Sequence, residues 1–273
     1  MAYAFPGEGA LDYFPCNYGG SRLLFRGPRR SLDRPYIAFL GGTETYGKYV
    51  PDPFPDLVEG EIGFAAINLG CVNAGPDVYL NEPSVIAIAR AAEAVVLQVT
   101  GAVNLSNAYY SVHPRRNDRF IAASPLLKTL YRDVDFTEFN FTRHMLNTLH
   151  ATSKERFEVV SADLRREWVL RMQELLAQMP DRTVLLWIAD DAPQALRGLD
   201  KDPILVDAAM IAEIRPAAAA YVEAVTTPQD RQAGLDGMAF AALESLAAAA
   251  LPGPAVHRQV AKKLVAVLEG VLQ

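Results

Sequence analysis

The sequence predicts an α/β fold, a three-layer α/β/α sandwich built around a parallel sheet. Short apolar runs of strand length alternate with helical patterns along the chain, which indicates parallel strands with helices on both faces. The run Ala94–Val99 is apolar at nearly every position, as expected for a strand buried on both faces. The first three runs each end in a polar, glycine-containing loop. Such loops lie at the carboxyl edge of a parallel sheet, where ligands bind.

Length and composition exclude several classes of protein. The chain has 273 residues, 51% of them hydrophobic, which predicts a single α/β domain over residues 1–273. A net charge of −6 argues against a nucleic-acid partner, which needs a basic face. Two cysteines without a CxxC or Cys/His cluster give no metal signature, and no cofactor is predicted. The N-terminus shows no leader pattern, and no apolar run reaches the length of about 18 residues typical of a membrane span. We therefore expect a cytoplasmic protein with no membrane span, and leave open whether it is a homo-oligomer.

The individual elements follow in chain order. Residues 1–35 are rich in Gly, Pro and Arg and are expected to form an irregular N-terminal arm, whose arginines either face an anion or are solvated. Strands are expected at residues 36–40, 65–69, 94–99, 183–189 and 221–225. Helices are expected at residues 56–63, 82–92, 154–179, 208–220 and 254–272. Residues 108–150, rich in Tyr, Phe, Arg, Asn and His, are expected to form an inserted lid with short helices.

The turn after the first strand allows two interpretations. Residues 42–48 match the phosphate-loop pattern G-x-x-x-x-G-K, which would make the protein a P-loop-type kinase or sulfotransferase. Tyr49 stands where that pattern needs Ser or Thr to hold Mg²⁺, and Asp190 could supply the acidic metal ligand. The other interpretation uses all three loops together.

That second interpretation depends on four sequence blocks. The segment FLGGTETYG resembles the first block, FxGDSxTxG, of the SGNH (GDSL-like) hydrolases, and INLGCVNAGP, VVLQVTGAVN and PAVHRQVAKKL resemble the later blocks. The resemblance implies an SGNH/flavodoxin-like sandwich. It places Thr43 at the nucleophile and His257 at the catalytic base. It places Gly70 and Asn104 at the donors that stabilise the oxyanion.

The chain also departs from the SGNH pattern. Gly42 replaces an aspartate, Thr43 replaces the serine, and Pro254 replaces the aspartate that orients the imidazole. A threonine has a restricted χ1 and a crowded hydroxyl, and an imidazole without its carboxylate loses an orienting partner. Asp190 and Asp207 are candidates to replace that carboxylate. We expect an acyl-ester hydrolase or acyltransferase, with a non-catalytic ligand-binding protein on the same fold as the alternative.

The expected substrate is a small or carbohydrate-like molecule. Arg115, Arg116 and Arg119, in HPRRNDRF after the third loop, are expected to contact an anionic group, unless they pair with acidic residues such as Asp118. Gly42 and Asn73 are expected to line the substrate site. The whole chain also resembles a bacterial family of unknown function, through segments such as YFPCNYGGSRLLFRGPRR and DFTEFNFTRHML.

Overall fold

The computed structural model describes residues 9–194 and 198–273 and contains a five-stranded parallel sheet. The strand order is β2-β1-β3-β6-β7. The strands are β1 (Tyr36–Leu40), β2 (Ala65–Asn68), β3 (Ala94–Gln98), β6 (Thr183–Ala189) and β7 (Ala220–Val225). All side chains of β1, β3 and β6 are buried, as expected for strands covered on both faces. The predicted fold class is therefore confirmed.

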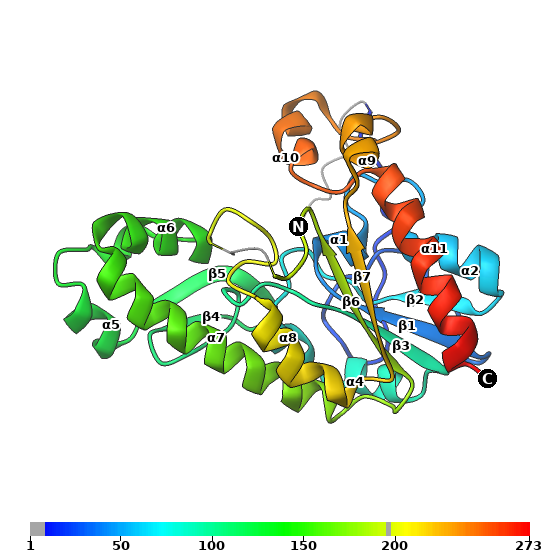
Figure 1. The fold of residues 1–273 in the computed structure, drawn as a ribbon, viewed down its shortest axis with the longest axis horizontal. Coiled ribbons are helices and arrows are strands. Elements are labelled where there is room, and N and C mark those ends of the chain that lie inside the picture. The colour runs from blue at the N-terminus through cyan, green and yellow to red at the C-terminus, as the bar shows by residue number, and fades with distance from the viewer. Residues whose placement is uncertain (1–8, 195–197) are drawn as a thin grey trace.

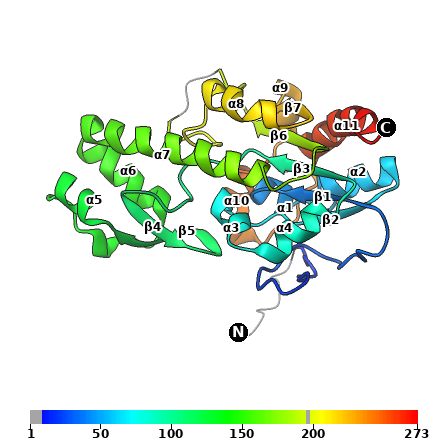
Figure 2. The same cartoon turned by 90° about the horizontal axis from the view of Figure 1, so that it is seen from below.

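Helices cover both faces of the sheet (Figure 1). One face is covered by α2 (Phe54–Ile62) and α11 (Pro254–Val271), and the other by α3 (Pro76–Leu80), α4 (Pro83–Arg90), α7 (Lys154–Leu176) and α8 (Ala208–Ile214). Figure 2 shows α7 and α8 side by side along this second face. Helix α8 ends earlier than expected, and a 3₁₀ turn (Arg215–Ala217) containing Pro216 follows it. Proline lacks the N–H that a continuing helix needs.

Side chains cap the open edges of the sheet. At the β2 edge, Glu59 Oε2 accepts from the Ala66 N–H at 2.9 Å. At the β7 edge, Lys263 donates to the Glu223 carbonyl at 2.8 Å. Such caps satisfy groups that an added strand would otherwise use, which disfavours edge-to-edge association.

Residues 108–150 contain a hairpin that the sequence analysis did not predict. It consists of β4 (Tyr110–His113) and β5 (Arg116–Ala123), followed by α5 (Pro125–Leu130), a 3₁₀ turn (Phe136–Glu138) and α6 (Thr142–Thr152). The turn, Pro114–Arg115, lacks the Asn-Gly or Asp-Gly pair that usually signals a hairpin. This segment lies to one side of the sheet in Figure 1, and its role as a lid stays a prediction.

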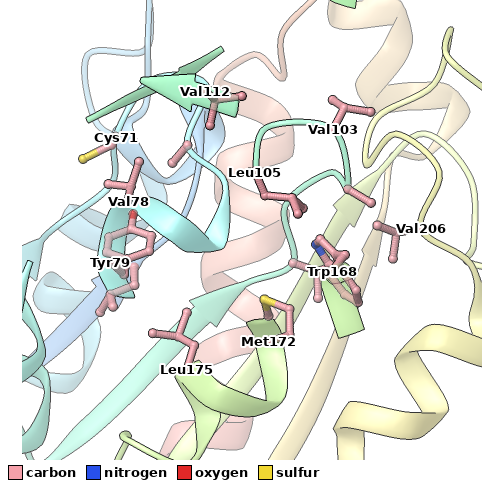
Figure 3. Close-up of a cluster of buried hydrophobic side chains, with 14 of the residues drawn as sticks. Cys71, Val78, Tyr79, Val103, Leu105, Val112, Trp168, Met172, Leu175 and Val206 are labelled. Carbon is pink, nitrogen blue, oxygen red and sulfur yellow. The ribbon is translucent and has the colours of Figure 1, made fainter. Parts of the chain in front are cut away.

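A buried cluster of hydrophobic side chains joins residues 108–150 to the sheet (Figure 3). Trp168, on α7, is fully buried, and its indole N–H donates to the Thr100 carbonyl at 2.9 Å. Val103 and Leu105, in the loop after β3, are buried in the same cluster. Helix α7 therefore holds the third loop of the sheet in a fixed position.

In the described part of the N-terminal arm, Arg26 and Arg30 contact the rest of the domain, while Arg22, Arg29 and Arg34 are exposed. Arg26 is 8% exposed, and its guanidinium donates to the carbonyls of Gly47 and Pro51, each at 2.6 Å. Arg30 pairs with Glu59 at 3.3 Å. These contacts give Arg26 and Arg30 a structural role, and anion binding by the exposed arginines stays a prediction.

The remaining elements are short. They are α1 (Thr43–Tyr46), α9 (Pro228–Ala233), a 3₁₀ turn (Ala242–Glu244) and α10 (Ser245–Ala249). Across the part of the chain that the structure describes, no helix is long and apolar enough to cross a membrane.

Candidate functional site

The first loop, residues 41–45, follows β1 and is held in place by hydrogen bonds to the Tyr79 hydroxyl. The buried Tyr79 hydroxyl accepts from the Gly41 N–H at 2.8 Å and lies 2.6 Å from the Gly41 carbonyl and 3.0 Å from the Leu69 carbonyl. A Cβ at Gly41 would overlap Thr45 and Gln98, so the turn requires glycine. Tyr79 thus links the first and second loops.

Gln98, the last residue of β3, fixes the same loop from the other side. Its Oε1 accepts from the Gly42 N–H at 2.9 Å, the Thr45 N–H at 3.2 Å and the Thr45 hydroxyl at 2.6 Å. Only an oxygen can accept from these three donors, so the other end of the Gln98 amide is the NH₂. This NH₂ faces Glu44 and donates to Glu44 Oε2 at 2.7 Å. The backbone N–H groups of Gly42 and Thr45 are therefore engaged by the protein itself.

Thr43, Asn73 and Asn104, three of the residues expected at the site, are linked by hydrogen bonds. The Thr43 hydroxyl donates to Asn73 Oδ1 at 3.3 Å and accepts from the Asn73 N–H at 3.0 Å. Asn104 Nδ2 donates to the Asn73 carbonyl at 2.9 Å. Asn73 Nδ2 in turn donates to Asp118 on the hairpin at 3.2 Å. Thr43 thus has an asparagine amide beside it, and an amide cannot act as a general base.

The predicted oxyanion donors are engaged in protein contacts. The Gly70 N–H donates to Asn68 Oδ1 at 3.0 Å, and the Asn104 amide is held by the Asn73 carbonyl and by the Thr142 hydroxyl, which lies 2.7 Å from Asn104 Oδ1. An oxyanion hole needs donors aimed at the reacting oxygen. In this arrangement the Gly70 N–H is engaged and Asn104 uses one of the two N–H groups of its amide on Asn73, and Gly70 allows close contact with the backbone of Tyr46.

His257 lies in the core, which corrects its expected position beside Thr43. It is 2% exposed, its Nδ1 accepts from the Phe54 N–H at 3.0 Å, and its ring stacks on Phe54. Burial, with a smaller contribution from the Arg26 charge, lowers the pKa of His257 to about 3. Thr43 and His257, both within the described residues, share no hydrogen bond. His257 therefore holds α11 against α2 and is not placed to act as a base for Thr43.

The helical pattern of the C-terminal segment already indicates that His257 is buried. His257 falls on the same helical stripe as Ala261, Leu264 and Leu268, all buried against the sheet and α2. Pro254, at the first turn of α11, places His257 inside the helix and not in the preceding loop. The two candidate carboxylate partners lie against other groups: Asp207 caps α8 and pairs with Arg165 at 2.7 Å, and Asp190 lies 4.0 Å from Arg231.

The arginines of the hairpin border the Thr43 cluster. Arg115 and Arg116 are exposed at the hairpin turn, and Arg119 stacks on Phe141 with its guanidinium 4.2 Å from the ring centroid. Asn117 holds the hairpin against the second loop by accepting from the Gly75 N–H at 3.2 Å. The anion-contact role of these arginines stays a prediction.

The geometry does not support the phosphate-loop interpretation of residues 42–48. In a phosphate loop the lysine opens a long helix whose N–H groups face the phosphates. Here Gly47 and Lys48 follow the end of the four-residue α1, and Lys48 lies over the Tyr49 ring at 4.6 Å. Gly47, at φ 70°, ends the helix instead of opening one.

A cavity of about 480 Å³ opens beside Glu44, at the carboxyl ends of β6 and β7. Three other surface hollows of 460 to 500 Å³ exist, so its position and chemistry distinguish it more than its volume does. Among the described residues, its wall carries six carboxyl side chains and two basic ones: Glu44, Asp190, Asp191, Asp200, Asp202 and Asp230, with Lys201 and Arg231. The segment before α11, including Gly253 and Ala249, forms the opposite wall.

Glu44 lines this cavity and has a shifted pKa. Burial first, and the neighbouring Asp202 carboxylate second, raise the pKa of Glu44 above its ordinary value. The hydrogen bond from Gln98 and the more distant Arg143 oppose this shift. Arg143 itself pairs with Asp202 at 2.8 Å.

Sequence reasoning missed Glu44, Gln98 and Tyr79. Gln98 carried a signal, since it is the polar residue within the apolar run Ala94–Val99. Glu44 lies one residue after the expected nucleophile, and no local pattern marks it, because its partners come from remote segments. Among residues 9–194 and 198–273, no group of three or more His, Cys, Asp or Glu side chains is arranged to hold a metal ion.

Comparisons with known proteins identify the family. The model described as Domain of unknown function (DUF6473) matches residues 1–272, so the chain belongs to this family. A search of curated proteins gives no match.

Several solved structures are similar to this one. A carbohydrate esterase family 2 enzyme with a carbohydrate-binding domain from Corynascus thermopiles (Myceliophthora fergusii) is 12% identical, with a TM-score of 0.42, over 90% of this chain and 69% of that one. An acetyl xylan esterase from the rumen bacterium Butyrivibrio proteoclasticus is 11% identical, with a TM-score of 0.42, over 92% and 67%. A protein from Lactobacillus plantarum is 15% identical, with a TM-score of 0.39, over 86% and 97%. At these values the function of this chain must be argued from its own residues.

Proposed function

We propose that this member of the DUF6473 family binds a small polar molecule, neutral or positively charged, in the cavity beside Glu44. The observation that carries the proposal is the wall of that cavity, where carboxyl groups outnumber basic groups by six to two among the residues that the structure describes. The cavity lies at the carboxyl edge of the sheet, where ligands bind in open α/β folds, and its volume falls within the range of small-molecule sites.

The charge balance defines the class of ligand. Lys201 pairs with Asp191 at 2.8 Å, and Arg231 lies 4.0 Å from Asp190, so both basic groups face acidic partners. Asp202 pairs with Arg143 and Asp230 accepts from the Thr227 hydroxyl, so the described carboxyl groups still outnumber the cations. This excess favours amines and hydroxyls, which donate hydrogen bonds, over phosphate or carboxylate. An anionic ligand in this cavity would meet repulsion from several sides.

A thermal-shift screen tests this proposal. Glucosamine, glucose, putrescine and glycerol 3-phosphate are added at millimolar concentration to the wild type and to two variants of α10. Ala249→Trp places a large side chain on the cavity wall, and Ala247→Trp adds the same side chain at an exposed position outside the wall. The proposal expects stabilisation by an amine or a sugar that Ala249→Trp abolishes and Ala247→Trp preserves. Stabilisation by glycerol 3-phosphate alone would overturn it.

Acyl-ester hydrolysis or transfer at Thr43, on an SGNH-like fold, is the second candidate function. The meeting of Thr43, Asn73 and Asn104 at the strand ends favours it. Its test is the hydrolysis of p-nitrophenyl acetate by the wild type and by Thr43→Ala. Because Thr43 has no base beside it, we expect equal rates. A rate that falls at least tenfold in Thr43→Ala would establish this second function instead.

A further inference from the structure

The inserted segment 108–150 carries a surface groove that the proposed function does not use. This groove has a volume of about 490 Å³ and lies between β5 and the stretch that runs from α5 to the 3₁₀ turn at Phe136–Glu138. We call it the β5 groove. Among the described residues it shares no lining residue with the cavity beside Glu44, and its elements lie at the opposite end of the molecule from α11 (Figure 2). It is therefore a separate surface.

One side of the β5 groove is an open edge of a strand. Strand β5 pairs with β4 on its other side, and the two form a sheet of their own. On the groove side, the Phe120 N–H donates to the Asn140 carbonyl at 3.1 Å. Beyond Phe120, no described residue forms a strand or bridge against this edge.

Ala123 presents its backbone groups to this open edge. It stands opposite Tyr110, whose N–H donates to Asn107 Oδ1 at 3.2 Å and whose carbonyl accepts from the Asn107 N–H at 3.0 Å. The backbone groups of Tyr110 thus point away from β5, and in an antiparallel pair those of the opposite residue then also point outward. No hydrogen bond to a described residue engages the Ala123 N–H or carbonyl. Both edges of the five-stranded sheet are capped by side chains, and this edge has no such cap within the described residues.

The surface beside this edge is apolar. Ile121, on β5, is 58% exposed and lines the groove together with Val134 and Phe136. The floor is Tyr131, which is fully buried and whose hydroxyl donates to the Leu149 carbonyl at 3.1 Å. The groove therefore offers a fixed apolar surface to an apolar side chain such as Val, Ile or Leu.

The charges of the groove are mainly positive. Lys128 and Arg132 line it, are exposed, and form no ion pair with another described residue. Asp133, next in sequence, is held by an ion pair to α7 at 2.7 Å. Asp135 lines the groove, but its Oδ1 accepts from the Thr137 N–H at 2.9 Å and the Thr137 hydroxyl at 2.7 Å. In a chain of net charge −6, this local excess of cations favours a carboxylate.

We propose that the β5 groove binds an extended segment of a partner protein that carries an apolar side chain and an acidic residue. The segment adds a strand beside Ala123, places its apolar side chain on Ile121 and directs its carboxylate to Lys128 and Arg132. The open strand edge argues for a polypeptide, because a fatty acid has no backbone groups to pair with it. This inference is independent of the ligand site beside Glu44.

Amide hydrogen exchange of the free protein, followed by NMR, tests the open edge. The Ser124 N–H donates to the Tyr109 carbonyl at 2.8 Å across the hairpin. We expect the Ala123 amide to exchange at least tenfold faster than the Ser124 amide. Equal protection of the two amides would show that the edge is already covered, and would overturn the inference.

Peptide selection tests the partner class. Random heptapeptides displayed on phage are selected against the full-length protein, and an enriched peptide is synthesised. We expect the enriched sequences to contain apolar residues and at least one Asp or Glu, and the synthetic peptide to slow exchange of the Ala123 amide at least tenfold. A selection without enriched sequences, or a peptide that leaves the Ala123 amide unchanged, would overturn the inference.

Charge reversal tests the cations of the groove. Lys128→Glu and Arg132→Glu are each expected to weaken binding of the synthetic peptide at least tenfold, measured by fluorescence anisotropy. Lys262→Glu, at an exposed position on α11, is the matched control and is expected to bind as the wild type does. Circular dichroism verifies that all three variants are folded. Equal affinity in the two groove variants and the control would overturn the acidic partner.

Decanoate distinguishes a peptide site from a fatty-acid site. It supplies an apolar chain and a carboxylate but cannot pair with the strand edge. We expect it to displace the synthetic peptide only at a concentration at least tenfold above the peptide's own dissociation constant. Displacement at or below that dissociation constant would assign the groove to a fatty acid and overturn the proposal.

Discussion

The buried His257 predicts a specific dependence of stability on pH. Its Nδ1 accepts a hydrogen bond from the Phe54 N–H, so the ring must be neutral with its proton on Nε2. Protonation would place a hydrogen on Nδ1, break this bond and bury a charge. The folded state therefore resists protonation, with a pKa of about 3 against the ordinary value of 6.5.

The size of the effect follows from this difference. When a basic group has a lowered pKa in the folded state, the unfolded state binds its proton first as pH falls. Above about pH 7 the imidazole is neutral in both states and has no effect. Below about pH 6 the free energy of unfolding is expected to fall by about 1.4 kcal/mol per pH unit, reaching about 2 kcal/mol at pH 5. The loss levels off near pH 3, at a total of about 5 kcal/mol.

Urea unfolding of the wild type and of His257→Asn at pH 8, 6 and 5 measures this contribution. The Asn Oδ1 can still accept from the Phe54 N–H but cannot be protonated, so the difference between the two proteins isolates the imidazole from other titrating groups. We expect the variant to be less stable at pH 8, because it loses the stacking on Phe54, and to lose less stability than the wild type by pH 5. His144→Asn, at an exposed position on α6, is the control. Parallel loss of stability in the wild type and His257→Asn would refute the neutral, buried imidazole.

Two further substitutions test the loops that form the edge of the sheet, and a third, in α2, is their control. Tyr79→Phe removes the hydroxyl that accepts from the Gly41 N–H and leaves that buried donor unpaired, so we expect the free energy of unfolding to fall by about 1 to 3 kcal/mol, measured by urea unfolding. Gly75→Ala would place its Cβ against the Asn104 carbonyl, and a loss of about 1 to 3 kcal/mol is expected. Gly60→Ala, with nothing within 4 Å of the added Cβ and a helical position in α2, is expected to stabilise by up to about 1 kcal/mol. Similar effects at Gly75 and Gly60 would contradict the packing described here.

The sheet could be predicted from the sequence because its signals are local. Runs such as Thr183–Ala189 are apolar throughout and have strand length, and the loops that follow the first three strands contain glycine. The meeting of Thr43, Asn73 and Asn104 follows from the parallel order of β1, β2 and β3, which brings their carboxyl ends together.

The rest of the site depends on partners that are remote in sequence. Glu44 receives its environment from Gln98, Asp202 and Arg143, which come from three other segments. The hairpin β4–β5 lacks a glycine turn, so its local sequence does not predict it. This hairpin places Asp118 in contact with Asn73, which lies 45 residues earlier in the chain. The prediction that His257 lies beside Thr43 was wrong. It followed the resemblance of four sequence blocks, whereas the apolar stripe of α11 places His257 in the core.

The central claim is that ligands bind beside Glu44 and not covalently at Thr43. Amide chemical shifts recorded while glucosamine is added test it most directly. The account predicts changes concentrated at cavity residues such as Glu44, Thr226 and Gly253, with Asn73 and Asn104 unaffected. Changes confined to Asn73 and Asn104, with none at the cavity wall, would contradict it.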